Sequence, residues 1–347
     1  MRFNLSFKWL SLESMNMAID LGTTSTLIYT KDEGIVLEED SMVAIDKNTR
    51  EMITAGKEVK EMLGRIPDNI IISEPLEDGV IADFKLVEEM LRFFIGKVQK
   101  RRLFIKPKVV VAVPSGITPV EKRAVINSIE EAGAREVYLV SEPIAAALGE
   151  GMPVTEPAGN MIIDIGGGTT EIAVIALSGI VNKVSIKIAG NELDDAIQTY
   201  MYDKYNMAIG KVSAEKIKKN IGSAHPSVEN KEMEIRGRDL VEGLPKKIII
   251  NSNEIREAMS ETLGLMKNAI KKSLSETPPE LASDIVEKGL FLTGGGALLS
   301  GIDKMISKST NLKVSVSEDP LRGVVKGAGI ILVNINEYRD LLMDPNR

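Results

Sequence analysis

The chain has 347 residues, which suggests about two domains at ~150 residues per domain, and its 44% hydrophobic and 27% charged residues exclude a disordered or collagen-like chain. Its 43 basic and 50 acidic residues leave a net charge of −7, which argues against nucleic acid as a partner. Without cysteine, and with His225 as its single histidine, the chain has no disulfide, no thiolate catalysis and no cysteine or multi-histidine metal site.

Short β-branched runs alternate with longer segments of helical period, which predicts sheets covered by helices. We expect strands at residues 18–29, 109–113, 136–140, 161–165, 171–176 and 290–293. The run at 109–113 is apolar on both faces, as is typical of a buried parallel strand. Residues 85–98 carry the apolar stripe of a helix. The sequences TPVE at 118–121 and TPPE at 277–280 predict capping boxes at the starts of two further helices.

An internal sequence repeat divides the chain into two halves. Residues 18–28 read AIDLGTTSTLI, and residues 162–172 read IIDIGGGTTEI. Each copy is an apolar strand containing an aspartate, then a turn of glycine and threonine, then a second strand. Residues 152–159, rich in proline and glycine, are the best candidate for the boundary between the halves. The duplication indicates two related domains whose turns face each other across a cleft.

Each copy of the repeat contains one aspartate, Asp20 or Asp164, inside an apolar strand. A charge is costly there unless it is compensated. Glycine turns let backbone N–H groups approach an anion, and threonine hydroxyls add donors. Two such turns predict a polyphosphate held from both sides, with both aspartates at a Mg²⁺ through water. The alternative is two ordinary hairpins with exposed aspartates, which the repetition disfavours.

Two further features fit an anionic ligand. The sequence LFLTGGGALL at 290–299 follows a strand with three glycines, which suits close approach to a base or ribose, or an ordinary strand–helix loop. Glu142 ends a strand where α/β ligands bind, so it is a candidate to orient an attacking water; the alternative is a carboxylate that complements a helix dipole. Neither the Walker pattern nor the dinucleotide glycine pattern is present.

Four motifs resemble the superfamily of actin, sugar kinases and heat-shock chaperone ATPases: IDLGTT at 19–24, SEPIAAA at 141–147, IDIGGGTT at 163–170 and LTGGG at 292–296. Within it the chain resembles the MreB family of bacterial actins over about residues 17–335, since DGVIADF at 78–84, PSGITPVEKR at 114–123 and PPELASDI at 278–285 are typical of that family. The resemblance implies an α/β, actin-like fold (ribonuclease H-like and duplicated). It would have two domains, each a mixed sheet flanked by helices, and a nucleotide cleft between them. It also implies ATP and Mg²⁺ as cofactors, slow ATP hydrolysis, and membrane-associated filaments that organise cell-wall synthesis and maintain cell shape.

The resemblance also assigns roles to single residues. Asp20 and Asp164 would lie at the Mg²⁺, and Glu142 and Thr169 would position the hydrolytic water. The residues that would contact phosphates are Gly22, Thr23, Thr24 and Ser25 on one side, and Gly166, Gly167, Gly168 and Thr169 on the other. Those that would contact the nucleoside are Glu215, Lys216, Ile217, Lys218, Gly294, Gly295, Gly296, Ala297 and Leu298. A surface ion pair between Glu215 and Lys218 is the alternative for that pair.

The same resemblance predicts the domain organisation: a tail at 1–17, domain I at 18–156, domain II at 157–320, and a C-terminal helix with a tail at 321–347 that returns to domain I. Three positions depart from the family pattern. Ser25 replaces the usual asparagine, Ser141 replaces an acid, and Glu74 stands where an arginine is usual. Ser25 keeps a donor, so we expect nucleotide binding to survive, whereas Glu74 reverses a charge and alters the contacts of its region.

Two segments have the character of membrane anchors. Residues 1–17 hold the only tryptophan, Trp9, and two of the seven phenylalanines, Phe3 and Phe7. Residues 97–108 place six basic residues and no acidic one around Leu103 and Phe104. We expect both to bind an anionic lipid surface together, which predicts a cytoplasmic protein peripheral to the inner face of the membrane. The alternatives are a tail folded back on the domain and a solvated basic loop.

The expected partners are other copies of the chain, the membrane, and proteins of cell-wall elongation and shape. A small-molecule kinase of the same superfamily is the leading rival, but it needs a further catalytic acid and acceptor-binding insertions that we do not find. A chaperone ATPase would need a substrate-binding domain, for which a chain ending at Arg347 leaves no room. A member that binds ATP without hydrolysing it stays open.

Overall fold

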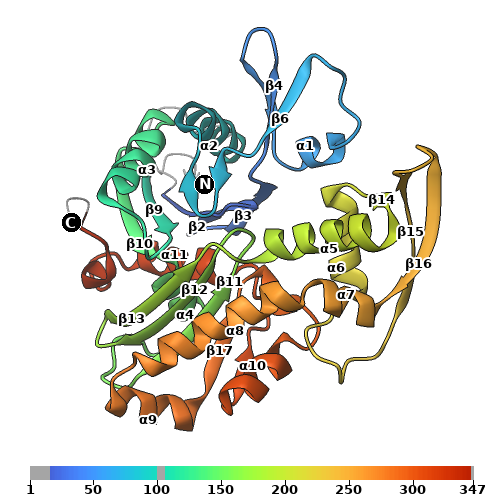
Figure 1. The fold of residues 1–347 in the computed structure, drawn as a ribbon. Helices are drawn as coiled ribbons and strands as arrows, with labels where there is room; N and C mark the ends of the chain where they lie inside the picture. The colour runs from blue at the N-terminus through green and yellow to red at the C-terminus, as the bar shows by residue number, and fades with distance from the viewer. Residues whose placement is uncertain (1–15, 100–105, 345–347) are drawn as a thin grey trace, which may run out of the picture.

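The computed structural model describes residues 16–99 and 106–344, and two five-stranded sheets form its centre (Figure 1). The first sheet has the order β10 (Glu136–Ser141), β9 (Lys108–Val113), β1 (Met17–Leu21), β2 (Ser25–Thr30), β3 (Gly34–Asp40). The second has the order β13 (Gly179–Ile186), β12 (Thr170–Ala176), β11 (Asn160–Ile165), β17 (Leu290–Thr293), β18 (Val314–Val316).

Both sheets have the same topology. Strands β1 and β11 each pair antiparallel with the next strand and parallel with a later one, β9 and β17 respectively. A further parallel strand lies outside each of these, β10 and β18, and an antiparallel one, β3 or β13, closes the other edge. The sequence repeat therefore corresponds to a duplicated mixed sheet, and the predicted actin-like fold is confirmed.

Helices cover the outer faces of the two sheets. The first sheet is covered by α2 (Phe84–Val98) and α3 (Pro119–Glu131), and the second by α8 (Ser260–Ser275), α9 (Pro279–Lys288) and α10 (Ile302–Thr310) (Figure 1). Two separate hydrophobic cores lie under these helices, one for each sheet.

A third core joins the two halves through α4 (Glu142–Gly149) and α11 (Gly323–Val333), which pack against each other. Helix α11 contacts β1, β2 and β9, whereas α4 contacts strands of both sheets. Glycine makes this contact possible: a Cβ added to Gly327 would lie 1.7 Å from the carbonyl oxygen of Ala145, and one on Gly149 would lie 1.9 Å from that of Gly323. The helices thus touch backbone to backbone and tie the halves together at their base.

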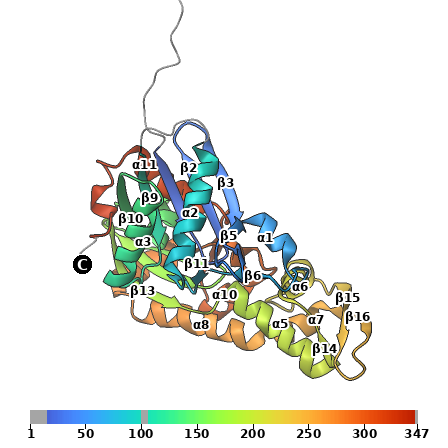
Figure 2. The ribbon, with the colours of Figure 1, turned by 90° about the horizontal axis from the view of Figure 1, so that it is seen from above.

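Each half also carries a smaller subdomain. The first consists of β4 (Val43–Asp46), β5 (Met52–Ala55), α1 (Lys57–Met62) and β6 (Ile70–Ser73), followed by the hairpin of β7 (Leu76–Glu77) and β8 (Val80–Ile81). The second consists of α5 (Gly190–Tyr205), β14 (Met207–Ala208), α6 (Lys211–Ile221), β15 (Glu232–Asp239), β16 (Pro245–Asn251) and α7 (Ser252–Ala258). The chain also forms the short helices η1 (Gly295–Leu298) and η2 (Arg339–Leu341). Figure 2 shows β14, β15 and β16 at one end of the molecule, with β10 and α11 at the other. Within the described part, no helix has the length and apolarity needed to cross a membrane.

Local sequence signals set some of the helix starts, where a side chain caps the first turn. The capping box at Thr118 is confirmed, because its hydroxyl accepts from the N–H of Glu121 while the Glu121 carboxylate accepts from the N–H of Thr118. The box predicted at Thr277 is wrong. Helix α9 begins at Pro279, and the Thr277 hydroxyl instead donates to the carbonyl of Ser273 at the end of the preceding helix.

Candidate functional site

The turns of the two repeated hairpins meet face to face. The turn between β1 and β2 is closed by the N–H of Gly22 donating to the carbonyl of Ser25, and the turn between β11 and β12 by Gly166 donating to Thr169. A Cβ added to Gly167 would lie 1.7 Å from Oγ1 of Thr24. The two turns, from opposite halves of the chain, are therefore in contact, and only glycine fits where they meet.

A third segment closes this contact from one side. The N–H of Gly79, between β7 and β8, donates to Oγ1 of Thr23 at 2.9 Å. Gly79 has a φ of 76° and its added Cβ would lie 2.8 Å from Pro114 and 3.2 Å from Thr169, so close packing and conformation both require glycine. The preceding residue, Asp78, forms an ion pair of 3.7 Å with Lys187 of the second half. The family motif at 78–84 thus belongs to the site, although the sequence assigned it no role there.

Three carboxylates gather next to the turns. Asp20 lies in β1 and Asp164 in β11, each in the last part of its strand, and Glu142 opens α4. Burial raises the pKa of Asp20 to about 7. Burial, with the charge of Asp20 and of other acids, raises the pKa of Asp164 to about 7. The pKa of Glu142 is raised well above its usual value by burial and by the charges of Asp20, Glu171 and Asp164. The three groups are close enough to repel one another.

Among the described residues no group of three or more histidine or acidic side chains is arranged to hold a metal ion, so a divalent cation here would need ligands from water or phosphate besides the two aspartates. Asp20 and Asp164 come from opposite hairpins, and among the described residues neither forms an ion pair. Mg²⁺ prefers hard oxygen ligands such as carboxylates that no basic side chain neutralises, and it keeps several bound waters in such sites. These two residues would hold it.

The other three phosphate-side residues predicted from the sequence, Ser25, Gly168 and Thr169, are also at the turns. Ser25 begins β2 directly after Thr24, and Gly168 lies against the first turn, since its added Cβ would be 3.0 Å from Thr23. Thr169 is buried beside Gly79.

The glycine loop after β17 lies against the same strand as Asp164. Gly294 has a φ of 81°, and its added Cβ would be 2.2 Å from the Asp164 carboxylate. A Cβ on Gly296 would be 2.2 Å from the side chain of Ile165. Gly295, Ala297 and Leu298 continue in η1, where Ala297 is buried and Leu298 is exposed. The structure therefore brings this loop to the cluster, and close packing on β11 requires glycine at 294 and 296.

Helix α6 carries the predicted nucleoside contacts at 215–218. The structure differs from the sequence prediction in the ion pairs of this segment and in the burial of one of its residues. Glu215 and Lys218 do not pair with each other. Glu215 pairs with Lys219 at 2.7 Å and with Lys60 of α1, in the other half of the chain, at 3.2 Å. The ammonium of Lys218 donates to Asp194 at 2.8 Å. Of the two residues between them, Lys216 is exposed, whereas Ile217 is fully buried in the core of the second half, so its side chain cannot contact a ligand.

Three comparisons with known proteins agree with this geometry. The family model described as MreB/Mbl protein matches residues 14–340. The chain belongs to the MreB/Mbl family. Cell shape-determining protein MreB of Escherichia coli strain K12 is 48% identical over 336 residues, covering 95% of this chain and 97% of that protein. Cell shape-determining protein Mbl of Bacillus cereus is 46% identical, covering 92% and 96%. The crystal structure of MreB 5 of Spiroplasma citri bound to AMPPNP superimposes with a TM-score of 0.90 at 38% identity, covering 94% of this chain and 99% of that one.

One site residue of this MreB/Mbl member was missed by the sequence reading. Glu171 of β12 lies directly opposite Asp164 in the strand register and is 1% exposed. Its carboxylate accepts from both the N–H and the hydroxyl of Ser115, which follows β9 in the other half. The sequence did contain a signal for Glu171, because it is an acidic residue inside the apolar run 170–176. A buried acid needs a partner.

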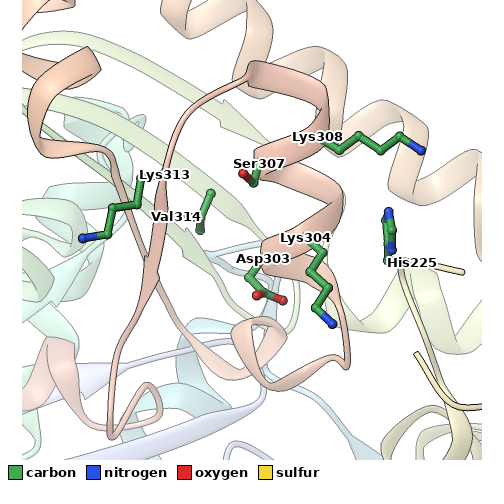
Figure 3. A pocket seen from close by; sticks show the side chains of 7 residues that line it. All are labelled: His225, Asp303, Lys304, Ser307, Lys308, Lys313 and Val314. Atoms are coloured by element: carbon green, nitrogen blue, oxygen red, sulfur yellow. The ribbon is translucent and has the colours of Figure 1, made fainter. Parts of the chain in front are cut away.

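Other predictions concern the surface. The proposed membrane contacts Phe3, Phe7, Trp9, Leu103 and Phe104 lie outside the described residues. His225 lies in a loop, and its Nδ1 contacts the hydroxyl of Ser227 at 2.9 Å. It borders a hollow of about 530 Å³ whose other lining includes Lys304 and Lys308 of α10 (Figure 3).

Proposed function

We propose that this MreB/Mbl member is an ATP-dependent, actin-like cytoskeletal protein that hydrolyses ATP slowly to ADP and phosphate. One observation carries the proposal: two matched turns from opposite halves touch at Gly167 and Thr24, with the half-buried Asp20 behind one and the buried Asp164 behind the other. The relative from Spiroplasma citri, 38% identical, has been crystallised with AMPPNP, a nucleotide of the same class.

The residues present suggest a division of labour. Backbone N–H groups and hydroxyls at 22–25 and 166–169 would bind the phosphates, and Asp20 and Asp164 would hold Mg²⁺ through water. When bound, magnesium would neutralise charge on the transferred phosphoryl group. The raised pKa of Glu142 suits it to accept a proton from the attacking water, and the Thr169 hydroxyl would help to orient that water. The adenosine would lie against 294–298 and α6.

Nucleotide binding is the first step to test. A fluorescent ATP analogue with Mg²⁺ should bind the native chain, and Asp20→Asn or Asp164→Asn should weaken binding more than tenfold and remove its Mg²⁺ dependence. Asp32→Asn, an exposed acid between β2 and β3, is the control and should bind normally. Unchanged Mg²⁺ dependence in both site variants would overturn the proposal.

We also propose that nucleotide-bound copies assemble head to tail into filaments that maintain cell shape. The tip between β15 and β16 supports this, because Val241 is 80% and Leu244 is 58% exposed at the outer end of the second half (Figure 2). Such a contact is heterologous and therefore extends. The double variant Val241→Asp and Leu244→Asp should abolish ATP-dependent light scattering while it retains nucleotide binding; unchanged scattering contradicts this surface.

Membrane attachment completes the proposal. Segments 1–17 and 97–108 would anchor the filament on the inner face of the cytoplasmic membrane, where proteins of cell-wall elongation and shape would bind it. In liposome flotation with anionic lipid, the native chain should float, and a variant with Phe3, Phe7, Leu103 and Phe104 changed to serine should not. Flotation of that variant would reject the anchor.

A further inference from the structure

A hollow on the second half of the molecule is lined mainly by basic side chains. It has a volume of about 530 Å³ and lies between α10, the loop 222–228 after α6, and the start of β18 (Figure 3). None of the residues assigned above to ATP or Mg²⁺ lines it. A volume of this size is typical of a site for a small molecule.

The lining is positively charged, although the chain as a whole is acidic. Three lysines against one aspartate, Asp303, give it a net charge of +2 with His225 neutral, whereas the whole chain carries −7. Lys304 and Lys308 lie one turn apart on α10, and Lys313 directly precedes β18. Within the part of the chain that the structure describes, none of these lysines forms an ion pair. Two like charges one turn apart destabilise a helix slightly, and a bound anion would remove that cost.

His225 adds a hydrogen-bond donor at the border of the hollow. Its Nδ1 accepts from the N–H of Ser227 at 3.2 Å, so the neutral ring carries its proton on Nε2. Nε2 has no hydrogen-bond partner among the described residues. Lys304 and Lys308 project from α10 on the side of His225 (Figure 3). The two ammonium groups and the imidazole N–H are therefore all donors to an anion placed between them.

The loop that carries His225 is fixed to the start of α10. The N–H of Ala224 donates to the carbonyl of Ser300 at 2.8 Å, and Ser223 forms a bridge with the same residue. A Cβ added to Gly301, which has a φ of 75°, would lie 3.0 Å from the Cβ of His225, so this close packing requires glycine. The walls are thus built before a ligand arrives, which lowers the entropic cost of binding one.

We propose that this hollow binds a compact anion of the phosphate class, either an inorganic polyphosphate or a small phosphate ester with two or more negative charges. Lys304 and Lys308 would neutralise its charge, and Nε2 of His225 would donate to one of its oxygens. Basic groups from three separate segments around one hollow suit a compact ligand better than an acidic peptide, whose carboxylates are spread along a line. The alternative is solvated surface lysines, with Lys308 complementing the dipole of α10 at its last turn.

The single histidine provides a local probe for the test. In the nucleotide-free, tag-free chain, the Cε1–H resonance of His225 is the only histidine signal in a nuclear magnetic resonance spectrum. Tripolyphosphate should shift it saturably, whereas chloride at the same ionic strength should not. The double variant Lys304→Ala and Lys308→Ala should weaken binding about tenfold or more, and Asp303→Asn should strengthen it about twofold. The matched control is Lys267→Ala with Lys271→Ala, which have the same spacing on α8 and should leave the affinity unchanged.

The results separate this site from general surface charge and from the proposed ATP site. An equal shift with chloride, native affinity in the α10 double variant, or an equal loss in the α8 control would overturn the proposal. Gly167→Ala, placed at the proposed ATP site, should keep the tripolyphosphate response, so a failure of the proposed function leaves this result unchanged. Fructose bisphosphate as a second probe distinguishes the two sources: similar affinity indicates a phosphate ester, and binding of tripolyphosphate alone indicates an inorganic polyphosphate.

Discussion

The buried carboxylates should destabilise the protein whenever nucleotide and Mg²⁺ are absent, and Asp164→Asn tests this directly. Burial and neighbouring acids raise the pKa of Asp164 from 3.8 to about 7. An acid whose pKa is higher in the folded than in the unfolded chain favours folding only while it is protonated. Its penalty is therefore absent below pH 3.8, grows through the interval, and is complete above pH 7.

The size of the effect follows from that shift. The ionised group should cost the folded chain about 4 kcal/mol at pH 8.5 and about 2 kcal/mol at pH 5.5. Asparagine has nearly the same shape and no charge, so the variant should be more stable than the native chain, and the gap should widen with pH. Removing this charge also relieves Glu142, whose pKa is raised in part by Asp164.

Equilibrium urea unfolding of the metal- and nucleotide-free protein at both pH values measures this gap. The exposed control Asp32→Asn should show no gap at either pH. A variant that is no more stable than the native chain at pH 8.5, or a gap that does not change with pH, would refute the reasoning. With Mg²⁺ and ATP present the order should reverse, because the native cluster is then neutralised and only the native chain gains binding energy.

Three further predictions follow from single contacts. Gly167→Ala should lower ATP affinity more than tenfold with little loss of thermal stability, because its Cβ would push the two turns apart; native affinity, measured with a fluorescent ATP analogue, contradicts this. Lys60→Met removes the ion pair with Glu215 that joins the two halves, so ATP affinity should fall about two- to fivefold at low salt and less at high salt, and a salt-independent loss argues against the pair. Gly327→Ala should lower the unfolding temperature strongly, because its Cβ meets a helix backbone. Gly96→Ala, in open space on α2, is the control and should raise the free energy of unfolding by about 1 kcal/mol. Equal effects of the two variants in thermal melts would exclude the close α4–α11 contact.

The sequence by itself determined the parts that depend on neighbours a few residues apart. The hairpin turns at Gly22 and Gly166 and the capping box at Thr118 are local, since turn chemistry and capping act within about four residues. The run at 109–113 was predicted to be a buried parallel strand, and it pairs parallel with both β1 and β10. Repetition of the hairpin then gave the duplicated fold.

Tertiary structure alone decided which distant groups meet. Ser115 and Glu171 are separated by 56 residues, and Lys60 and Glu215 by 155, so no local pattern pairs them. The Thr277 box failed for a local reason, because its hydroxyl bonds to the carbonyl of Ser273, four residues earlier at the end of the preceding helix. Local sequence fixes the conformation of a segment through sterics and short hydrogen bonds, whereas the partner of a buried charge depends on how whole sheets and helices pack.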